Sequence, residues 1–168
     1  YQKKTIIEKS PLGLITNEGD FSSGLEYVSH KEGKIDKHYL QEKIKHSKVH
    51  YQANILTCTF QDKKKREIAI NFQVSNNDIA FRYELPTWFE RRSCVIEKEV
   101  TGFRFPTETT AFLSYMMAPM GAFARTSPSY ESGYQTDVPI AETTGENGYV
   151  FPGLFKIGDD GWVLLSET

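Results

Sequence analysis

Carboxylates are the first side chains in this sequence that could carry chemistry, because two facing carboxylates hydrolyse glycosidic bonds as acid and base. Glu97 and Glu99 are two positions apart, which places them on one face of a strand. A solvent-facing strand edge has the same pattern, and we favour that structural interpretation. Asp159 and Asp160 lie between two glycines and are typical of a tight turn. No pair is convincing as acid and base, so we assign no catalytic residue.

The histidines and cysteines bear on metal binding. His46 and His50 have the four-residue spacing with which a helix aims two ligands at one metal ion. They enter a strand-like run, and no glutamate of the metalloprotease kind lies between them, so we interpret them as surface histidines. Cys58 and Cys94 form no CxxC pair, which indicates neither a zinc site nor a disulfide scaffold.

Glu131 has a different setting. It lies with Tyr130 and Tyr134 in the stretch SPSYESGYQTD (127–137), within roughly thirty residues that show no regular periodicity. Loops on a rigid scaffold are where binding residues concentrate, whereas the alternative is an exposed glutamate in a loop that the tyrosines pack down. Because Ca²⁺ takes about 6–8 oxygen ligands, Glu131 alone cannot form a calcium site, but it can contribute one ligand.

Alternation of apolar and polar residues dominates the chain and predicts the strands that must position these side chains. Residues 68–74 and 79–85 alternate on either side of the turn cluster at 75–78, which predicts a β-hairpin. Further strands are expected at 4–7, 13–16, 49–60, 95–103, 111–115, 149–157 and 162–166. Residues 31–45 come nearest to a helical repeat, but charges interrupt any apolar stripe. We predict about seven to nine antiparallel strands in an all-β sandwich.

Composition and charge limit the class of protein. A chain of 168 residues with 13% aromatic residues is long enough for one domain with a real core, and aromatic residues favour β-structure. A net charge of −2 with interspersed signs argues against a nucleic-acid partner. The basic run at 63–66 lies between two strand-like segments, and we interpret it as a solvated hairpin tip. No apolar run approaches the roughly 18 residues of a transmembrane helix, so we expect no membrane span.

Three blocks of sequence carry a family resemblance. They are SPLGL (10–14), DIAFRYELP (78–86), and GYVFPGLF (148–155) running into GDDGW (158–162). Together they resemble the N-terminal domain of glycoside hydrolase family 97, in the family's order, and AFRY is the most specific part. One departure is that Ile79 directly follows Asn77-Asp78, where the family often has a glycine.

The resemblance implies a fold and an activity. The family's N-terminal domain is a galactose-mutarotase-like β-super-sandwich, and its catalytic residues belong to a (β/α)8 barrel. Its members are exported enzymes, largely of the Bacteroidetes, that cleave α-glucosides or α-galactosides. We therefore expect residues 1–168 to be a single domain, most of the N-terminal sandwich without its first strands, in a longer exo-acting α-glycosidase. The expected partners are the absent C-terminal barrel of the same chain and an oligosaccharide substrate, and the expected location is the periplasm or outer membrane.

The resemblance also implies a role for Glu131. In the family a calcium ion is held mostly by barrel glutamates, and one more glutamate comes from a long loop of the N-terminal domain. The stretch YESGY at 130–134 matches that loop's tyrosine-containing setting. Glu131 is thus expected to be a calcium ligand, and Tyr130 and Tyr134 are expected to contact substrate.

Two other functions stay open on the sequence. In a stand-alone carbohydrate-binding module, exposed aromatic side chains would stack on sugar rings, although core or loop-packing roles for them are favoured. The candidates are Trp88, Phe89, Phe123, Tyr130 and Tyr134. An interaction domain would instead present an apolar surface patch of more than a few hundred Å².

Overall fold

The computed structural model describes residues 5–45, 47–88, 93–116, 133–143, 148–159 and 161–167. By its internal contacts the chain divides into two compact units, residues 11–101 and residues 1–10 with 102–168. Each unit has its own sheets and its own apolar core. No helix among the described residues is both long and apolar enough to cross a bilayer.

The predicted all-β class is confirmed, because every pair of strands in the described residues is antiparallel. The described strands, more numerous than predicted, are β1 (Leu14–Thr16), β2 (Gly19–Asp20), β3 (Glu26–Leu40), β4 (Lys48–Gln61), β5 (Glu67–Val74), β6 (Ile79–Glu84), β7 (Ile96–Glu99), β8 (Thr109–Tyr115), β9 (Tyr134–Pro139), β10 (Tyr149–Ile157) and β11 (Gly161–Leu165). A short 3₁₀ turn, η2 (Ile140–Glu142), follows β9.

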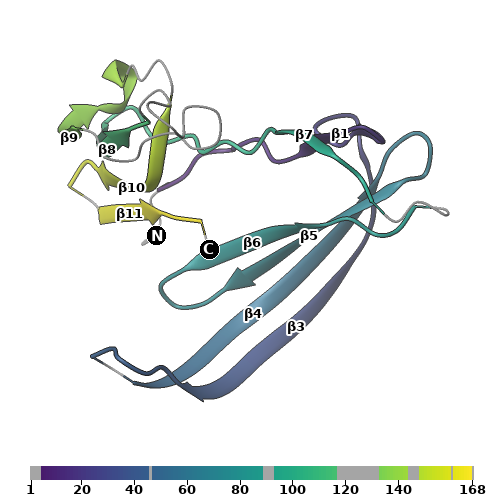
Figure 1. The fold of residues 1–168 in the computed structure, drawn as a ribbon, viewed down its shortest axis with the longest axis horizontal. Coiled ribbons are helices and arrows are strands. Elements are labelled where there is room, and N and C mark those ends of the chain that lie inside the picture. Colours follow the sequence, from purple (N-terminus) through teal and green to yellow (C-terminus); the bar gives the residue numbers. More distant parts are fainter. Residues whose placement is uncertain are drawn as a thin grey trace, which may run out of the picture. The chain divides into compact units, whose positions relative to one another are not determined.

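The unit of residues 11–101 contains two sheets, with strand orders β2-β1-β7 and β3-β4-β5-β6 (Figure 1). Leu14 of β1 and Ile68 of β5 lie in one buried cluster with Phe21 and Trp88. Both sheets therefore contribute to a shared core, as in a sandwich. These apolar side chains are removed from water, which is the main source of stability for such a unit.

The predicted hairpin at 68–85 is confirmed as β5 and β6, with Val74 paired to Ile79. The Ser75 hydroxyl oxygen accepts hydrogen bonds from the backbone N–H groups of Asn77 and Asp78, at 3.3 and 3.2 Å. No residue from Ser75 to Ile79 has a positive φ angle. The turn therefore does not need the glycine that the family often has at this point.

Strand β3 is the largest element that the sequence analysis did not predict. All of its residues are exposed except Ile35, which is half-buried. Because neither face is buried, the sequence has no reason to alternate apolar and polar residues there. The strand is defined by its backbone pairing with β4, from Glu26 opposite Gln61 to Leu40 opposite Lys48.

The second unit holds one sheet with strand order β11-β10-β8-β9. Its buried cluster includes Phe105 and Phe155, whose rings stack with centroids 4.3 Å apart. The strand predicted at 149–157 is β10, and the predicted hairpin with β11 closes with Ile157 opposite Gly161. The strand expected at 4–7 is wrong, since residues 6 and 7 form bends and none of residues 5–7 is in a strand.

Candidate functional site

Two of the three resemblance blocks meet at Gly13. Its N–H donates a 2.8 Å hydrogen bond to the Tyr83 hydroxyl, which is also 2.6 Å from the Thr101 hydroxyl. Gly13 has a φ of +152°, and an added Cβ would lie 2.7 Å from the carbonyl oxygen of Phe21. A side chain therefore has no room here. These residues fix the path of the chain rather than perform chemistry.

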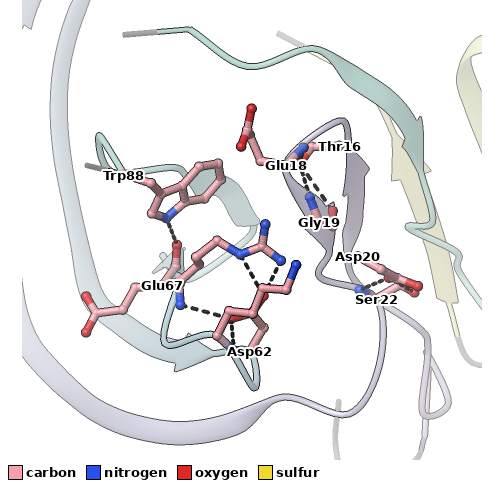
Figure 2. A network of polar contacts seen from close by, with 10 residues as sticks. Thr16, Glu18, Gly19, Asp20, Ser22, Asp62, Glu67 and Trp88 are labelled. Carbon is pink, nitrogen blue, oxygen red and sulfur yellow. Dashed lines mark hydrogen bonds and ion pairs between the residues drawn. The ribbon is translucent and has the colours of Figure 1, made fainter. Parts of the chain in front are cut away.

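The basic run at 63–66 is only partly the solvated tip that we predicted. Its three lysines are exposed, but the Arg66 guanidinium is paired with Asp62, and both side chains are 12% exposed. Asp62 Oδ1 also accepts hydrogen bonds from the backbone N–H groups of Lys64 and Arg66, at 2.8 and 2.9 Å (Figure 2). Burial opposes ionisation of Asp62, but the hydrogen bonds from Arg66 and Lys64 outweigh it and hold the pKa of this carboxyl below its ordinary value.

Trp88 is a core residue, which removes it from the candidates for sugar stacking. Its side chain is 8% exposed and stacks on Phe21 with ring centroids 5.2 Å apart. Its indole N–H donates to the carbonyl oxygen of Glu67 at 2.9 Å (Figure 2). The Arg66 guanidinium carbon lies 5.7 Å from the Phe21 ring centroid, within the range of a cation–π contact. Of the other aromatic candidates, Phe89 and Phe123 lie outside the described residues.

The predicted calcium ligand Glu131 also lies outside the described residues, as does Tyr130. The strands on either side of that segment, β8 and β9, are neighbours in one sheet. Tyr134 is the first residue of β9 and pairs with Ser114 of β8. The last residue of β8, Tyr115, pairs with Tyr149 of β10. Both ends of the segment are thus anchored in one sheet.

Tyr134 is brought to the surface of this sheet. It is 56% exposed, and its hydroxyl donates a 3.2 Å hydrogen bond to the carbonyl oxygen of Phe112. The neighbouring rings of Tyr115 and Tyr149 stack with centroids 5.3 Å apart, and the Tyr149 hydroxyl donates to Gln135 Oε1 at 3.1 Å. An exposed ring with a fixed hydroxyl is suited to stacking on a flat apolar face.

The carboxylates that follow Glu131 do not complete a calcium site in the described structure. Asp137 has a φ of +56°, and its Oδ1 accepts a 2.5 Å hydrogen bond from the Thr110 hydroxyl. Glu142 is exposed on η2, and Glu146 lies outside the described residues. A calcium ion needs about 6–8 oxygen ligands, and the described residues from 133 to 143 do not supply them.

A different group of metal-ligating side chains does come together, at the hairpin of β3 and β4. His50 Nε2 lies 2.7 Å from Asp36 Oδ1, and His38 Nε2 lies 3.9 Å from the same oxygen. Hydrogen bonds from Gln52 and from His50 hold the pKa of Asp36 below its ordinary value. From the sequence we considered His50 together with His46. The structure does not describe His46. The partner of His50 is His38, which lies opposite it in β3. Because β3 was not predicted, there was no register from which to find this pair in the sequence.

Glu97 and Glu99 of β7 lie on a solvent-facing strand edge, which is the structural interpretation that we favoured. Glu97 and Glu99 are exposed, and among the described strands β7 pairs with β1 alone, which makes it an edge strand of its sheet. Glu99 accepts a 2.5 Å hydrogen bond from the Thr101 hydroxyl. Cys58 and Cys94 are free thiols.

The known proteins that this chain resembles are glycoside hydrolases. A family model described as "Glycosyl-hydrolase 97 N-terminal" matches residues 1–168. A curated protein described as a probable retaining alpha-galactosidase, from Streptomyces bingchenggensis (strain BCW-1), is 26% identical over 166 residues, which are 98% of this chain and 23% of that protein. A crystal structure of a beta-arabinopyranosidase is 48% identical with a TM-score of 0.93, over 100% of this chain and 27% of the other.

A further solved structure shares the fold alone. It is a Glycoside Hydrolase Family 97 enzyme from Pseudoalteromonas sp. strain K8 in complex with panose, 23% identical, with a TM-score of 0.73 over 94% of this chain and 23% of that chain. This chain therefore spans about a quarter of the length of these relatives.

Proposed function

This chain belongs to the glycosyl-hydrolase 97 N-terminal family, and from that premise we propose that it is the scaffold domain of a calcium-dependent, exo-acting glycosidase. The observation that carries the proposal is the family match over residues 1–168, in relatives of which this chain covers only 23% and 27%. Of the two carboxylate pairs that we considered, Asp159 and Asp160 are typical of a tight turn, and Glu97 and Glu99 lie on an exposed strand edge. In this proposal the catalytic acid and base come from a (β/α)8 barrel in the remainder of the polypeptide, as the family resemblance implies.

Within this proposal, Glu131 is the residue that the domain lends to the active site. It precedes β9 by three positions, and β9 is paired to β8 and thus held by the sheet that β10 and β11 complete. A loop anchored in this way can carry a ligand to a neighbouring domain without disturbing its own core. The bound Ca²⁺ would help to position and polarise the substrate. Tyr134, exposed at the start of the same strand, would contact the sugar.

Two of the relatives have names that favour a galactose-like substrate, and we give them more weight than the panose complex, which is only 23% identical to this chain. One relative is described as an alpha-galactosidase and another as a beta-arabinopyranosidase. A β-L-arabinopyranoside has the ring configuration and axial leaving group of an α-D-galactopyranoside and lacks only the hydroxymethyl group on C5. One active site can therefore accept both. We propose that the intact enzyme prefers this configuration.

The substrate class is tested by initial rates of the intact enzyme on three aryl glycosides, the α-D-galactopyranoside, the β-L-arabinopyranoside and the α-D-glucopyranoside. We expect at least one of the first two to have a kcat/KM that exceeds that of the glucoside by at least about a hundredfold, because a site that hydrogen-bonds the hydroxyls of one epimer is left with unpaired polar groups by the other. A preference for the glucoside would overturn the substrate class and leave the scaffold role standing.

The scaffold role is tested by Glu131→Gln in the intact enzyme, with Glu142→Gln as the matched control. Glutamine keeps the size of the side chain and removes its charge. Glu142 is exposed on η2 in the same region, and its replacement should leave activity unchanged. We expect Glu131→Gln to lower kcat/KM by at least about tenfold, as for other residues that support a catalytic metal. Full activity in Glu131→Gln would refute the assignment.

A further inference from the structure

We propose that Asp36, His38 and His50 form a binding site for a divalent transition-metal ion such as Zn²⁺, which holds β3 and β4 together near the end of their hairpin. One ligand atom from each of these residues lies within 4.8 Å of the others, and no second group of three such side chains exists among the described residues. The site is independent of the proposed calcium site, since it uses other residues and another class of metal.

The group lies in the part of the sheet where β3 and β4 pair with each other alone, and a metal ion there would stabilise that pairing. Residues 54–61 of β4 pair with both β3 and β5, whereas residues 48–53 pair with β3 alone. Figure 1 shows β3 and β4 continuing past β5 and β6 as a two-stranded ribbon. An isolated two-stranded ribbon is at best marginally stable in water. An ion that binds the paired strands and not the separated ones stabilises the paired state by mass action.

The strand register brings the side chains to one face of the ribbon. His38 lies directly opposite His50, and Asp36 lies opposite Gln52. Residues two positions apart on a strand point to the same side, so all four side chains share that face. Directly opposite residues have Cβ atoms about 4.5–5.5 Å apart, from which two imidazoles reach a common ion.

The distances suit one ion with little adjustment. Ligand atoms about 2.0–2.1 Å from a tetrahedral metal lie roughly 3.3 Å from each other. The separations of His50 Nε2 and His38 Nε2 from Asp36 Oδ1, 2.7 and 3.9 Å, fall on either side of that value. The two imidazole rings are stacked with centroids 3.9 Å apart. With side chains 75% and 45% exposed, His38 and His50 have room to tilt until both nitrogens face the ion.

The surroundings of Asp36 favour metal binding over a simple ion pair. Gln52 Nε2 donates a 2.9 Å hydrogen bond to Asp36 Oδ2, which leaves Oδ1 directed at the histidines. Ligating carboxylates are commonly held by such a neighbouring group. Two imidazole nitrogens and one carboxylate oxygen suit Zn²⁺, Ni²⁺ or Cu²⁺. They do not suit Ca²⁺, which requires more oxygen ligands.

A positive charge beside His50 opposes the ion and provides an independent test. Lys48 lies opposite Leu40, one pair further along the same face, and lines a surface hollow of about 320 Å³ together with His38 and His50. Because like charges repel, removal of the ammonium group should strengthen metal binding. We expect Lys48→Gln to raise the affinity for Zn²⁺ by a few fold at low ionic strength.

The main test is calorimetric titration of ZnCl₂ into the intact protein in buffer saturated with Ca²⁺, so that any calcium site is filled. We expect one zinc site that His50→Ala weakens by at least about tenfold. His30→Ala is the matched control, since His30 is an exposed histidine of β3 outside the group, and it should bind Zn²⁺ as the wild type does. Equal zinc binding by the wild type and His50→Ala would overturn the proposal and leave an ordinary surface pair.

Amide hydrogen exchange gives a second readout that does not depend on the number of zinc sites elsewhere. Zn²⁺ should slow exchange in residues 35–40 and 48–53 of the wild type and leave it unchanged in His50→Ala. Exchange in these residues that is insensitive to Zn²⁺ in the wild type would also overturn the proposal.

Discussion

The two ends of strand β4 each lie beside an aspartate that pairs with a basic side chain, yet the two pairs have different surroundings. At one end, the side chains of Asp62 and Arg66 are 12% exposed and lie next to the stacked rings of Phe21 and Trp88. At the other end, Asp36 and His50 are 60% and 45% exposed on a two-stranded ribbon. The first pair is enclosed by the core, and the second faces solvent.

This difference decides what each pair can do. An enclosed pair costs free energy when one partner is lost, because the other is left buried and unpaired. An exposed pair contributes little to stability, so its side chains can turn toward a ligand at little cost. We therefore assign a structural role to Asp62 and Arg66, and a binding role to Asp36 and His50.

The largest expected effect is at the core beneath the enclosed pair. Phe21 is 1% exposed, so Phe21→Ala leaves a cavity under Arg66 and removes the stacking partner of Trp88. We expect the free energy of unfolding to fall by about 3–5 kcal/mol. The measurement is urea denaturation followed by tryptophan fluorescence. A loss below about 1 kcal/mol would mean that this region is not the core of its unit.

The next effect is on the enclosed pair itself. Asp62→Ala removes the acceptor of two backbone N–H groups and leaves the Arg66 guanidinium largely buried without its partner. We expect a loss of about 3 kcal/mol in urea denaturation. Glu26→Gln is the control, since Glu26 pairs with Lys65 in solvent, at 64% and 69% exposure, and should cost less than about 1 kcal/mol. Equal losses in the two variants would remove the contrast between enclosed and exposed pairs.

The stabilising effect of the enclosed Asp62 carboxylate should also depend on pH, with a smaller change in the free energy of unfolding than in the two variants above. The pKa of Asp62 in the folded protein is below its ordinary value, so its carboxylate stabilises the fold fully above about pH 4. That contribution is lost as the pH falls through the folded-state pKa. We expect the stability advantage of the wild type over Asp62→Asn to be constant from pH 7 to about pH 5 and to shrink below pH 4. An advantage that grows toward low pH would contradict the sign of this pKa shift.

The smallest effect is expected at the exposed end of β4. Without metal, His50→Ala should change the free energy of unfolding by no more than about 0.5 kcal/mol, because the side chain is exposed and its pair is screened by water. Urea denaturation in the presence of a chelator measures this value. A loss as large as that of Asp62→Ala would show that the ribbon already depends on this pair without any metal.

The parts of the fold that were predictable from the sequence are those where one face of a strand is buried. Ile68 of β5 is 1% exposed, and the alternation around it, with the turn cluster at 75–78, was enough to predict β5 and β6. Strand β3 has no buried face and therefore no apolar period. Its presence follows from pairing with β4, which is a property of two segments rather than of one.

The candidate sites were less predictable for the same reason. His38 and His50 are twelve positions apart in the sequence, and only the register of two strands brings them together. Arg66 was interpreted as solvated because the basic run lies between two strand-like segments, whereas the signal that mattered was Asp62 four positions earlier in the same turn. The role of Glu131 rests on family resemblance, since a single carboxylate between tyrosines does not identify a metal by its spacing.

The most direct test of the scaffold role is the calcium affinity of the intact enzyme, measured by calorimetry for the wild type, Glu131→Gln and Glu142→Gln. We predict that Glu131→Gln lowers the affinity for Ca²⁺ by at least about tenfold, while Glu142→Gln binds as the wild type does. The urea midpoint without Ca²⁺ should be the same in all three proteins, which separates loss of a ligand from loss of the fold. Wild-type calcium affinity in Glu131→Gln would contradict the claim that this domain lends a ligand to the active site.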